Sequence, residues 1–101
     1  MNNAVKTNLA PNAVGNYPHA RRVGNLLFLS GIGPRSAIDN SIAGNVYRAD
    51  HSVETYDITA QCHAVFANVQ AVLKASDASL CDLVDVTVYL TNMANDFKTY
   101  N

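Results

Sequence analysis

The longest regular pattern in the sequence is DITAQCHAVFANVQAVLKAS, residues 57–76. Its apolar residues recur at spacings of three and four, the period at which side chains share one face of an α-helix. These residues are Ile58, Cys62, Val65, Phe66, Val69, Val72 and Leu73. Asp57 suits the N-cap, because its carboxylate can accept hydrogen bonds from the free N–H groups of the first turn. Asp77 tolerates a left-handed turn better than most residues, so we expect the helix to end near it.

A strand is expected after this helix, because residues 84–91, VDVTVYLT, alternate apolar side chains with polar or aromatic ones. Residues 92–95, with Asn at both ends, suit a polar turn, and Asp96 then opens a helical pattern that reaches only Asn101. A helix of one turn is unstable alone in water, since nucleation is costly and one turn repays little of it. We therefore expect either that the chain is a C-terminally incomplete domain or that a partner holds its last residues.

Residues 19–23 and 26–30 are predicted to form a β-hairpin ahead of the helix. Gly24-Asn25 separates them, and this dipeptide supplies the positive φ angles of a two-residue turn. The continuous apolar run LLFL in the second strand is typical of a strand that is covered on both faces. Residues 35–50 carry Asn, Asp, Ser and Gly and are expected to be loop, with a short strand near Ile42.

These elements together predict an α+β fold. A hairpin, a helix, a strand and the start of a second helix form the first half of a split β-α-β sandwich, a mixed sheet with helices on one face. The C-terminal strand of that sandwich would be lacking. We assign residues 1–14 to a flexible N-terminal arm and residues 15–101 to a single domain that is incomplete at its C-terminus. The amphipathic face of the sheet, rich in Thr and Tyr, would be covered by another subunit.

The composition is that of a globular protein with few charges, since 49% of the residues are hydrophobic and 15% are charged. The net charge of −1 and the single basic pair, Arg21-Arg22, argue against nucleic-acid binding, which needs clustered Lys and Arg. No run approaches the about 18 apolar residues of a membrane span, and the N-terminus lacks the apolar core of a signal peptide. Cys62 and Cys81 make no disulfide framework, so a reducing, cytoplasmic location is expected.

Several motifs, in order and at matching spacing, resemble the Rid family (also called YjgF or L-PSP-like). They are NYPHA at residues 16–20, VGNLLFLSG at residues 23–31, DI, Q and NV at positions 57–58, 61 and 68–69, VDVTVYLTNM at residues 84–93, and DF with a later Asn at residues 96–101. The likeness covers residues 15–101, almost the whole chain. Within the family, residues 17–22 and 42–44 look most like the 2-aminomuconate deaminase branch.

The resemblance implies a chorismate-mutase-like α+β fold and a homotrimer with ligand clefts between its subunits. It also implies hydrolysis of reactive enamine or imine intermediates, similar to 2-aminoacrylate or 2-aminomuconate, to keto acids and ammonia. The substrate would be a small carboxylate, and neither a metal nor an organic cofactor would take part. Some members of the family are described instead as ribonucleases that act on single-stranded RNA.

Hydrolysis of an imine needs a cation for the substrate carboxylate, donors for its other polar atoms, and a positioned water with a proton acceptor. The resemblance implies that Tyr17 is the catalytic tyrosine of the pocket and that Ser30, Gly31 and Asn101 line the substrate site. Each also has an ordinary structural explanation. Tyr17 could be an aromatic residue of an interface, Ser30-Gly31 the end of a strand, and Asn101 a chain terminus.

The clamp arginine and the glutamate of the family belong to two motifs, P-[AT]-R and E-I-E, that do not occur in this sequence. Because arginine pairs bidentately with a carboxylate, Arg35 is a candidate for a substitute cation, and an exposed loop arginine is the alternative. His19 could transfer protons near neutral pH, or it could be a strand histidine with a solvated tip. We expect these 101 residues alone to have little or no deaminase activity.

Three hypotheses about function follow from the sequence. The first is an enamine or imine deaminase that is trimeric when complete. The second is a non-catalytic trimeric protein that binds small molecules or other proteins. The third is a single-stranded RNA endoribonuclease, against which stand the net charge and the absence of a basic stripe with stacking aromatic residues.

Overall fold

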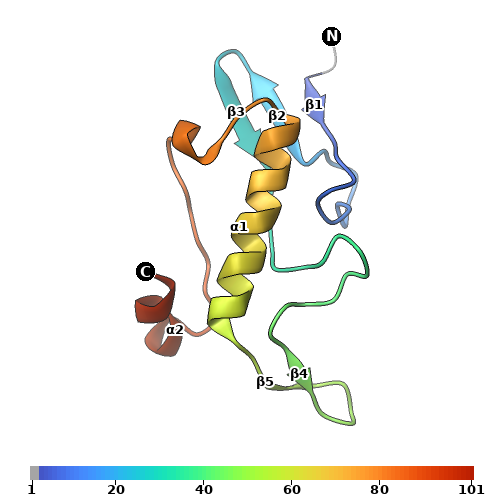
Figure 1. Cartoon of the computed structure of the whole chain (residues 1–101), viewed down its shortest axis with the longest axis vertical. Coiled ribbons are helices and arrows are strands. Elements are labelled where there is room, and N and C mark those ends of the chain that lie inside the picture. Colours follow the sequence, from blue (N-terminus) through green and yellow to red (C-terminus); the bar gives the residue numbers. More distant parts are fainter. Residues whose placement is uncertain (1–2) are drawn as a thin grey trace.

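The computed structural model describes residues 3–101 as an elongated α+β molecule with extents of 48 × 28 × 18 Å (Figure 1). Its elements are β1 (Ala4–Val5), β2 (Ala20–Val23), β3 (Leu26–Leu29), β4 (Val46–Tyr47), β5 (Val53–Thr55), α1 (Ile58–Ala75), a 3-10 helix η1 (Leu80–Asp82) and α2 (Met93–Tyr100). Strands β1-β2-β3 form one sheet and β4-β5 a second, and α1 runs between the two (Figure 1). The predicted α+β class is confirmed. No helix within residues 3–101 is long and apolar enough to cross a membrane.

The core lies where α1 packs on the first sheet. Val72 of α1 and Ala20 of β2 are completely buried, and Ala10 of the N-terminal segment joins them. The partly buried side chains around this cluster are Val5, Leu27, Leu29, Ile32 and Ala71. Three segments that are distant in sequence therefore meet at one place, and their relative positions are fixed there.

The segment assigned to a flexible arm, residues 1–14, contributes to this core. Its first two residues lie outside the described part of the chain. From residue 3 onward it forms β1, in which Ala4 pairs with Arg21 and Val5 with Ala20. The sheet and the buried Ala10 therefore position the described part of this segment.

The predicted hairpin is confirmed, with β2 and β3 paired in the register Ala20 to Leu29 and Val23 to Leu26. Gly24, the first of the two turn residues, has a φ of 58°, and no positive φ occurs at Asn25. This is the pattern of a type II′ turn, which matches the twist of the two strands.

The expectation that both faces of β3 are covered is wrong. Leu27 and Leu29 face the core and are half-buried, whereas Leu26 and Phe28 are 53% and 57% exposed. Alternate residues of a strand point to opposite faces, and within residues 3–101 only one face of this sheet carries a helix. A continuous apolar run therefore does not by itself show that a strand has two covered faces.

The predicted helix is confirmed as α1, which begins after Asp57 and has Ser76 as its C-cap. The Asp57 carboxylate accepts hydrogen bonds from the backbone N–H groups of Thr59 at 3.0 Å and Ala60 at 3.2 Å. Asp77 follows with a φ of 59°, the left-handed conformation predicted for it. The Asp57 side chain therefore caps the start of α1, and the left-handed backbone of Asp77 follows its end.

The loop before α1 holds the second sheet, which the sequence analysis did not predict. β4 and β5 are short and exposed, and Arg35 pairs with Ile42 in an isolated bridge near the expected short strand. Gly44 has a φ of 74°, and its carbonyl accepts the backbone N–H of Asp57 at 3.0 Å. This bond joins the loop to the N-cap of α1.

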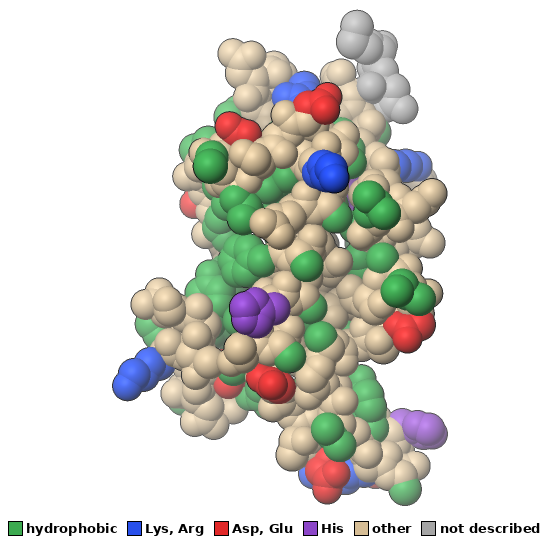
Figure 2. All heavy atoms as spheres, viewed as in Figure 1, with side chains coloured by type: hydrophobic (Ala, Val, Ile, Leu, Met, Phe, Trp, Pro, Cys, Tyr) green, Lys and Arg blue, Asp and Glu red, His purple; other side chains and the backbone are tan. Residues whose placement is uncertain are grey.

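The strand predicted for residues 84–91 is wrong. The segment is extended but unpaired within the described residues, and all strand pairs there are antiparallel, so no mixed sheet forms. A strand needs a neighbouring strand for its backbone N–H and C=O groups. Val84 and Tyr89 are 86% and 90% exposed. Figure 2 shows hydrophobic side chains gathered along the side of the molecule where this segment runs.

The turn predicted for residues 92–95 lies earlier, at residues 91–92, because α2 already begins at Met93. Asn92 is its N-cap and accepts the backbone N–H of Asn95 at 3.4 Å. Asp96, the expected start, lies inside the helix, is buried, and accepts a hydrogen bond of 2.6 Å from the Tyr56 hydroxyl. This bond raises the pKa of Tyr56 above its usual value of 10.0. The short helix is thus held by tertiary contact rather than by its own propensity.

Candidate functional site

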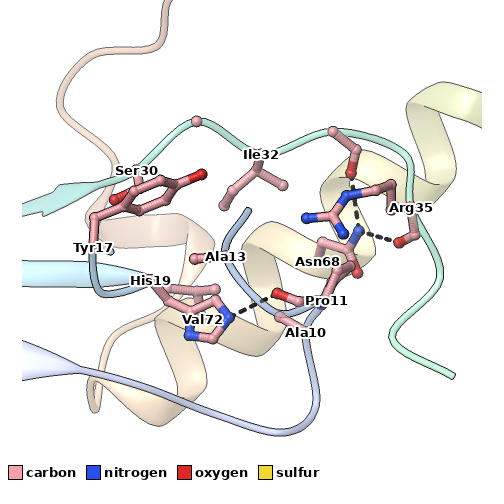
Figure 3. Close-up of a pocket in the computed structure, with 12 residues that line it drawn as sticks. Ala10, Pro11, Ala13, Tyr17, His19, Ser30, Ile32, Arg35, Asn68 and Val72 are labelled. Carbon is pink, nitrogen blue, oxygen red and sulfur yellow. Dashed lines mark hydrogen bonds between the residues drawn. The ribbon is translucent and has the colours of Figure 1, made fainter. Parts of the chain in front are cut away.

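A small cavity lies where the N-terminal segment, the end of β3 and α1 meet (Figure 3). Its volume is about 40 Å³, enough for about three water molecules. The residues that line it are Ala10, Pro11, Ala13, Tyr17, His19, Ser30, Gly31, Ile32, Gly33, Arg35, Asn68 and Val72. The lining thus combines apolar side chains with a phenol, an imidazole, a hydroxyl, a guanidinium and an amide.

Tyr17 and Ser30 lie together on one side of the cavity (Figure 3). The Ser30 hydroxyl donates to the Pro18 carbonyl at 2.7 Å, and its backbone N–H donates to the His19 carbonyl at 3.0 Å. These bonds hold the residues that follow Tyr17 against the end of β3. Within residues 3–101 no group bonds to the Tyr17 hydroxyl, and the residue is 40% exposed. The phenol is therefore available to a ligand.

His19 serves the structure of the site rather than offering a free imidazole. Its Nδ1 accepts the backbone N–H of Thr7 at 3.3 Å, and its Nε2 lies 2.8 Å from the Pro11 carbonyl oxygen. Since the Nδ1 atom is an acceptor and a carbonyl can only accept, the proton is assigned to Nε2. Both nitrogens are occupied by the N-terminal segment, which favours a structural role over proton transfer, the other alternative considered for His19.

Arg35 brings a permanent positive charge to the cavity lining. Its Nη1 donates to the Asn40 side-chain oxygen at 3.0 Å, and its Nη2 donates to the Asn12 carbonyl at 2.8 Å. A guanidinium has five N–H groups, so these two bonds orient it and leave other donors free. The arginine is half-buried and directed from its loop toward the N-terminal segment (Figure 3), not spread on the surface as a plain loop arginine would be.

Asn68 is a site residue that the sequence analysis missed as a functional group. It is buried in α1, and its side-chain Nδ2 donates to two carbonyl oxygens, that of Gly33 at 3.0 Å and that of Arg35 at 2.8 Å. It therefore fastens the Arg35 loop to the helix. A signal was present in the sequence: Asn68 lies three residues after Val65 and four before Val72, on the buried side of the helix.

The structure brings together four of the five residues predicted for the site. Tyr17, Ser30, Gly31 and Arg35 line the same cavity. A side chain added at Gly31 would meet no atom within 4 Å, so this wall is open to a ligand or to another chain. Asn101 is not among the lining residues; it is exposed at the end of α2. Within the described chain it does not contribute to the cavity.

The chemistry available in this lining is that of anion binding. Arg35 supplies a charge and bidentate donors, and Tyr17 supplies a free hydroxyl on the other side of the cavity (Figure 3). Within residues 3–101 no group of three or more His, Cys, Asp or Glu side chains is placed to hold a metal ion. The positive charge of Arg35 and the free Tyr17 hydroxyl are groups that would pair with an anion.

Fold and cavity define an α+β protein with a small polar site between a strand end, a loop and a helix. The family model described as endoribonuclease L-PSP matches residues 7–101. The chain therefore belongs to this family, the same Rid family to which its motifs point. A RutC family protein of Pyrococcus horikoshii is 37% identical over 101 residues, which are all of this chain and 71% of that relative.

Other relatives agree in both sequence and fold. A protein of Dermatophagoides farinae named 2-iminobutanoate/2-iminopropanoate deaminase is 36% identical over 97 residues, covering 96% of this chain and 66% of its own. The crystal structure of yeast Mmf1 has a TM-score of 0.80 at 29% identity, over 99% of this chain and 70% of that one. The crystal structure of Escherichia coli TdcF with bound serine has a TM-score of 0.78 at 28% identity, over 96% of this chain and 66% of that one. The chain spans about two thirds of the length of these proteins.

Proposed function

We propose that this chain forms the tyrosine-bearing wall of a deaminase site that hydrolyses small enamine or imine carboxylates to keto acids and ammonia. The observation that carries the proposal is the meeting of Tyr17, Ser30 and Arg35 around one cavity. A phenol with a free hydroxyl and a guanidinium are groups that bind a small anion, and Ser30 holds the backbone beside Tyr17 in place. The name of the Dermatophagoides relative supports the same class of reaction.

The reaction balances without an oxidant or a reductant. Water adds to the carbon of the C=N bond, the C–N bond then breaks, and imine plus water gives ketone plus ammonia. An enamine first takes a proton at carbon and becomes the imine. In this proposal Arg35 holds the substrate carboxylate through the N–H groups that Asn40 and Asn12 do not occupy, and the Tyr17 phenol donates a proton toward the leaving nitrogen.

The size of the cavity supports a site that is shared between subunits. Its about 40 Å³ is far below the about 300–1,000 Å³ of sites that enclose a small molecule. We propose that a homotrimer supplies the remaining walls. The exposed apolar side chains of residues 84–89 support this, because monomeric proteins rarely leave large apolar patches open to water. The 2-aminomuconate branch stays a prediction about the substrate.

The test separates binding from turnover. First, 2-oxobutanoate is titrated into the ¹⁵N-labelled chain, and we expect the amide signals of Gly31 and Gly33 to shift saturably. Second, ammonia release is measured while an amino-acid oxidase generates 2-iminobutanoate. We expect slow turnover by the 101-residue chain and faster turnover by a chimera that carries the segment following the matched region in the Pyrococcus relative. Tyr17→Phe should slow the chimera at least about tenfold.

Tyr47→Phe is the matched control, because Tyr47 is half-exposed and lies outside the cavity lining. It should leave ammonia release unchanged. Saturable binding of 2-oxobutanoate with no ammonia release from either chain would favour the non-catalytic binder. No binding and no release would overturn the deaminase proposal.

An endoribonuclease is the second candidate, because the family model carries that name. The charge distribution speaks against it: Lys and Arg side chains are scattered singly over the face seen in Figure 2. RNA binding depends on clustered cations, and its affinity falls steeply with salt. Cleavage of single-stranded RNA that persists through repurification and disappears in Tyr17→Phe would establish this candidate instead.

A further inference from the structure

Asn68 has one side-chain orientation that its partners fix. The residue is 8% exposed, and its Nδ2 donates to the carbonyl oxygens of Gly33 and Arg35 at 3.0 and 2.8 Å. Both carbonyl oxygens can only accept hydrogen bonds. Rotating the Asn68 amide by 180° would place its own oxygen against them and lose both bonds. The side-chain oxygen Oδ1 must therefore point away from the Gly33–Arg35 loop.

The Oδ1 atom of Asn68 has no donor among residues 3–101. Every completely buried side-chain nitrogen or oxygen in that part of the chain does have a hydrogen-bond partner. Oδ1 therefore keeps contact with open space, and Asn68 is one of the residues that line the cavity. A buried amide thus uses its donors on the protein and leaves its acceptor for whatever enters the cavity.

We propose that the Asn68 side-chain oxygen binds an N–H group of the ligand, and so selects a nitrogen-bearing acid over its keto acid. This inference rests on the proposed function and assigns the nitrogen end of the same site. An amide oxygen can accept from an imine, iminium or ammonium N–H, but has nothing to offer a ketone oxygen, which is itself an acceptor. A site built to pair with a donor rejects a ligand that lacks one, because its own acceptor is left unpaired.

The carboxylate end of the ligand would then bind hydrogen-bond donors, and its nitrogen end would bind a hydrogen-bond acceptor. Arg35 carries donors that suit the carboxylate, and Asn68 carries the acceptor that suits the nitrogen. Hydrolysis replaces C=NH by C=O and so removes the donor that Asn68 recognises. The product is therefore held less tightly than the substrate, which favours its release.

The experiment compares two stable ligands that differ at this one position, 2-aminobutanoate and 2-oxobutanoate. Both are titrated into the ¹⁵N-labelled chain, and the side-chain NH₂ signals of Asn68 are followed with the backbone amides of the cavity. We expect 2-aminobutanoate to bind more tightly. Asn68→Ala should weaken its binding by about 10- to 100-fold, the effect of losing one hydrogen bond to a charged group, and should change 2-oxobutanoate binding much less.

Gln61→Ala is the matched control. Gln61 also uses its amide to fasten a loop to α1, donating to the Asn45 side-chain oxygen at 2.8 Å, but it does not line the cavity. It should lower stability without changing the ratio of the two affinities. If Asn68→Ala does not fold, the affinities of the parent chain for 2-aminobutanoate and 2-oxobutanoate still test the inference. Equal affinity for the two ligands overturns it.

Two other results have distinct meanings. Equal weakening of both ligands by Asn68→Ala would show that Asn68 only holds the Arg35 loop, and would overturn this inference while leaving the proposed function intact. Failure of the parent chain to bind either ligand would overturn the proposed function, and the inference with it.

Discussion

Gly44 is the residue at which the backbone leaves least room for a side chain. Its φ is 74°, and a Cβ atom built there would lie 2.8 Å from the Asp57 carbonyl oxygen. A left-handed conformation costs a residue other than glycine roughly 1–2 kcal/mol, and the overlap with Asp57 adds to this. We expect Gly44→Ala to lower the free energy of unfolding by more than about 2 kcal/mol, measured by urea denaturation.

Gly31→Ala is the control for that measurement. No atom lies within 4 Å of a Cβ at Gly31, and its φ is not positive, so stability should change by less than about 0.5 kcal/mol. If the two variants unfold at the same urea concentration, the close contact between Gly44 and the N-cap of α1 does not govern stability.

His19 can be tested as a structural residue at the same scale. Both of its ring nitrogens bond to the N-terminal segment, and one such bond contributes about 1 kcal/mol, or about fivefold in an equilibrium. We expect His19→Phe to speed hydrogen exchange of the Thr7 amide by about five- to tenfold. His63→Phe, on the exposed side of α1, should leave that exchange unchanged. Unchanged exchange in His19→Phe would return His19 to consideration as a proton carrier.

The sequence motifs pointed to Tyr17 and Ser30, and Arg35 was named only as a substitute cation from a loop. All three line one cavity, and their roles in it stay predictions. The role of Asn68 depends on the carbonyls of Gly33 and Arg35, which are more than thirty residues away in sequence. A helical pattern shows which face is buried, but it does not show what a buried amide will find there.

Among the elements, α2 has a contact that should make its stability depend on pH. The Tyr56 hydroxyl donates to the buried Asp96 carboxylate at 2.6 Å, and this bond raises the pKa of Tyr56 above 10.0. A raised pKa means that the neutral phenol is favoured in the folded chain. Its stabilising contribution is therefore complete below pH 10 and is lost as the pH rises through the raised pKa.

We accordingly expect the backbone amides of α2 to lose protection above pH 10, earlier than those of α1. Tyr56→Phe should loosen α2 already at neutral pH and should remove the alkaline step. The ionisation of Tyr56 itself can be followed by tyrosinate absorbance, with Tyr56→Phe subtracted. An α2 that opens at the same pH with and without the Tyr56 hydroxyl would contradict this account.

At the level of elements, local signals were sufficient for the hairpin and for α1. The Gly24 turn and the Asp57 cap are each fixed by residues within a few positions, so the sequence predicts them well. Residues 84–91 have an equally clear strand pattern, yet they are unpaired in residues 3–101. The alternation of apolar and polar residues predicts which side chains would share a face of a strand. Whether the strand forms depends on a neighbouring strand, which a local sequence pattern does not predict.

For the whole molecule, the exposed segment 84–89 predicts self-association. Val86 is 52% exposed within a row of exposed apolar residues, and Ile38 is 95% exposed in a loop elsewhere. If a trimer buries that row, Val86→Glu should reduce the mass measured by light scattering toward that of the monomer. Ile38→Glu should not change it. A parent chain that is monomeric at all concentrations would exclude a trimer built by these residues alone.

The elongated outline of the chain has a consequence for its rotation in solution. α1 runs nearly along the 48 Å axis (Figure 1), and the N–H bonds of a helix lie almost parallel to its axis. Bonds parallel to the long axis of a rod are reoriented only by slow end-over-end tumbling. Bonds perpendicular to that axis are also reoriented by the faster rotation about it. The amides of α1 should therefore show a higher ratio of longitudinal to transverse relaxation times than those of the hairpin. That contrast should fade when chains assemble into a rounder particle.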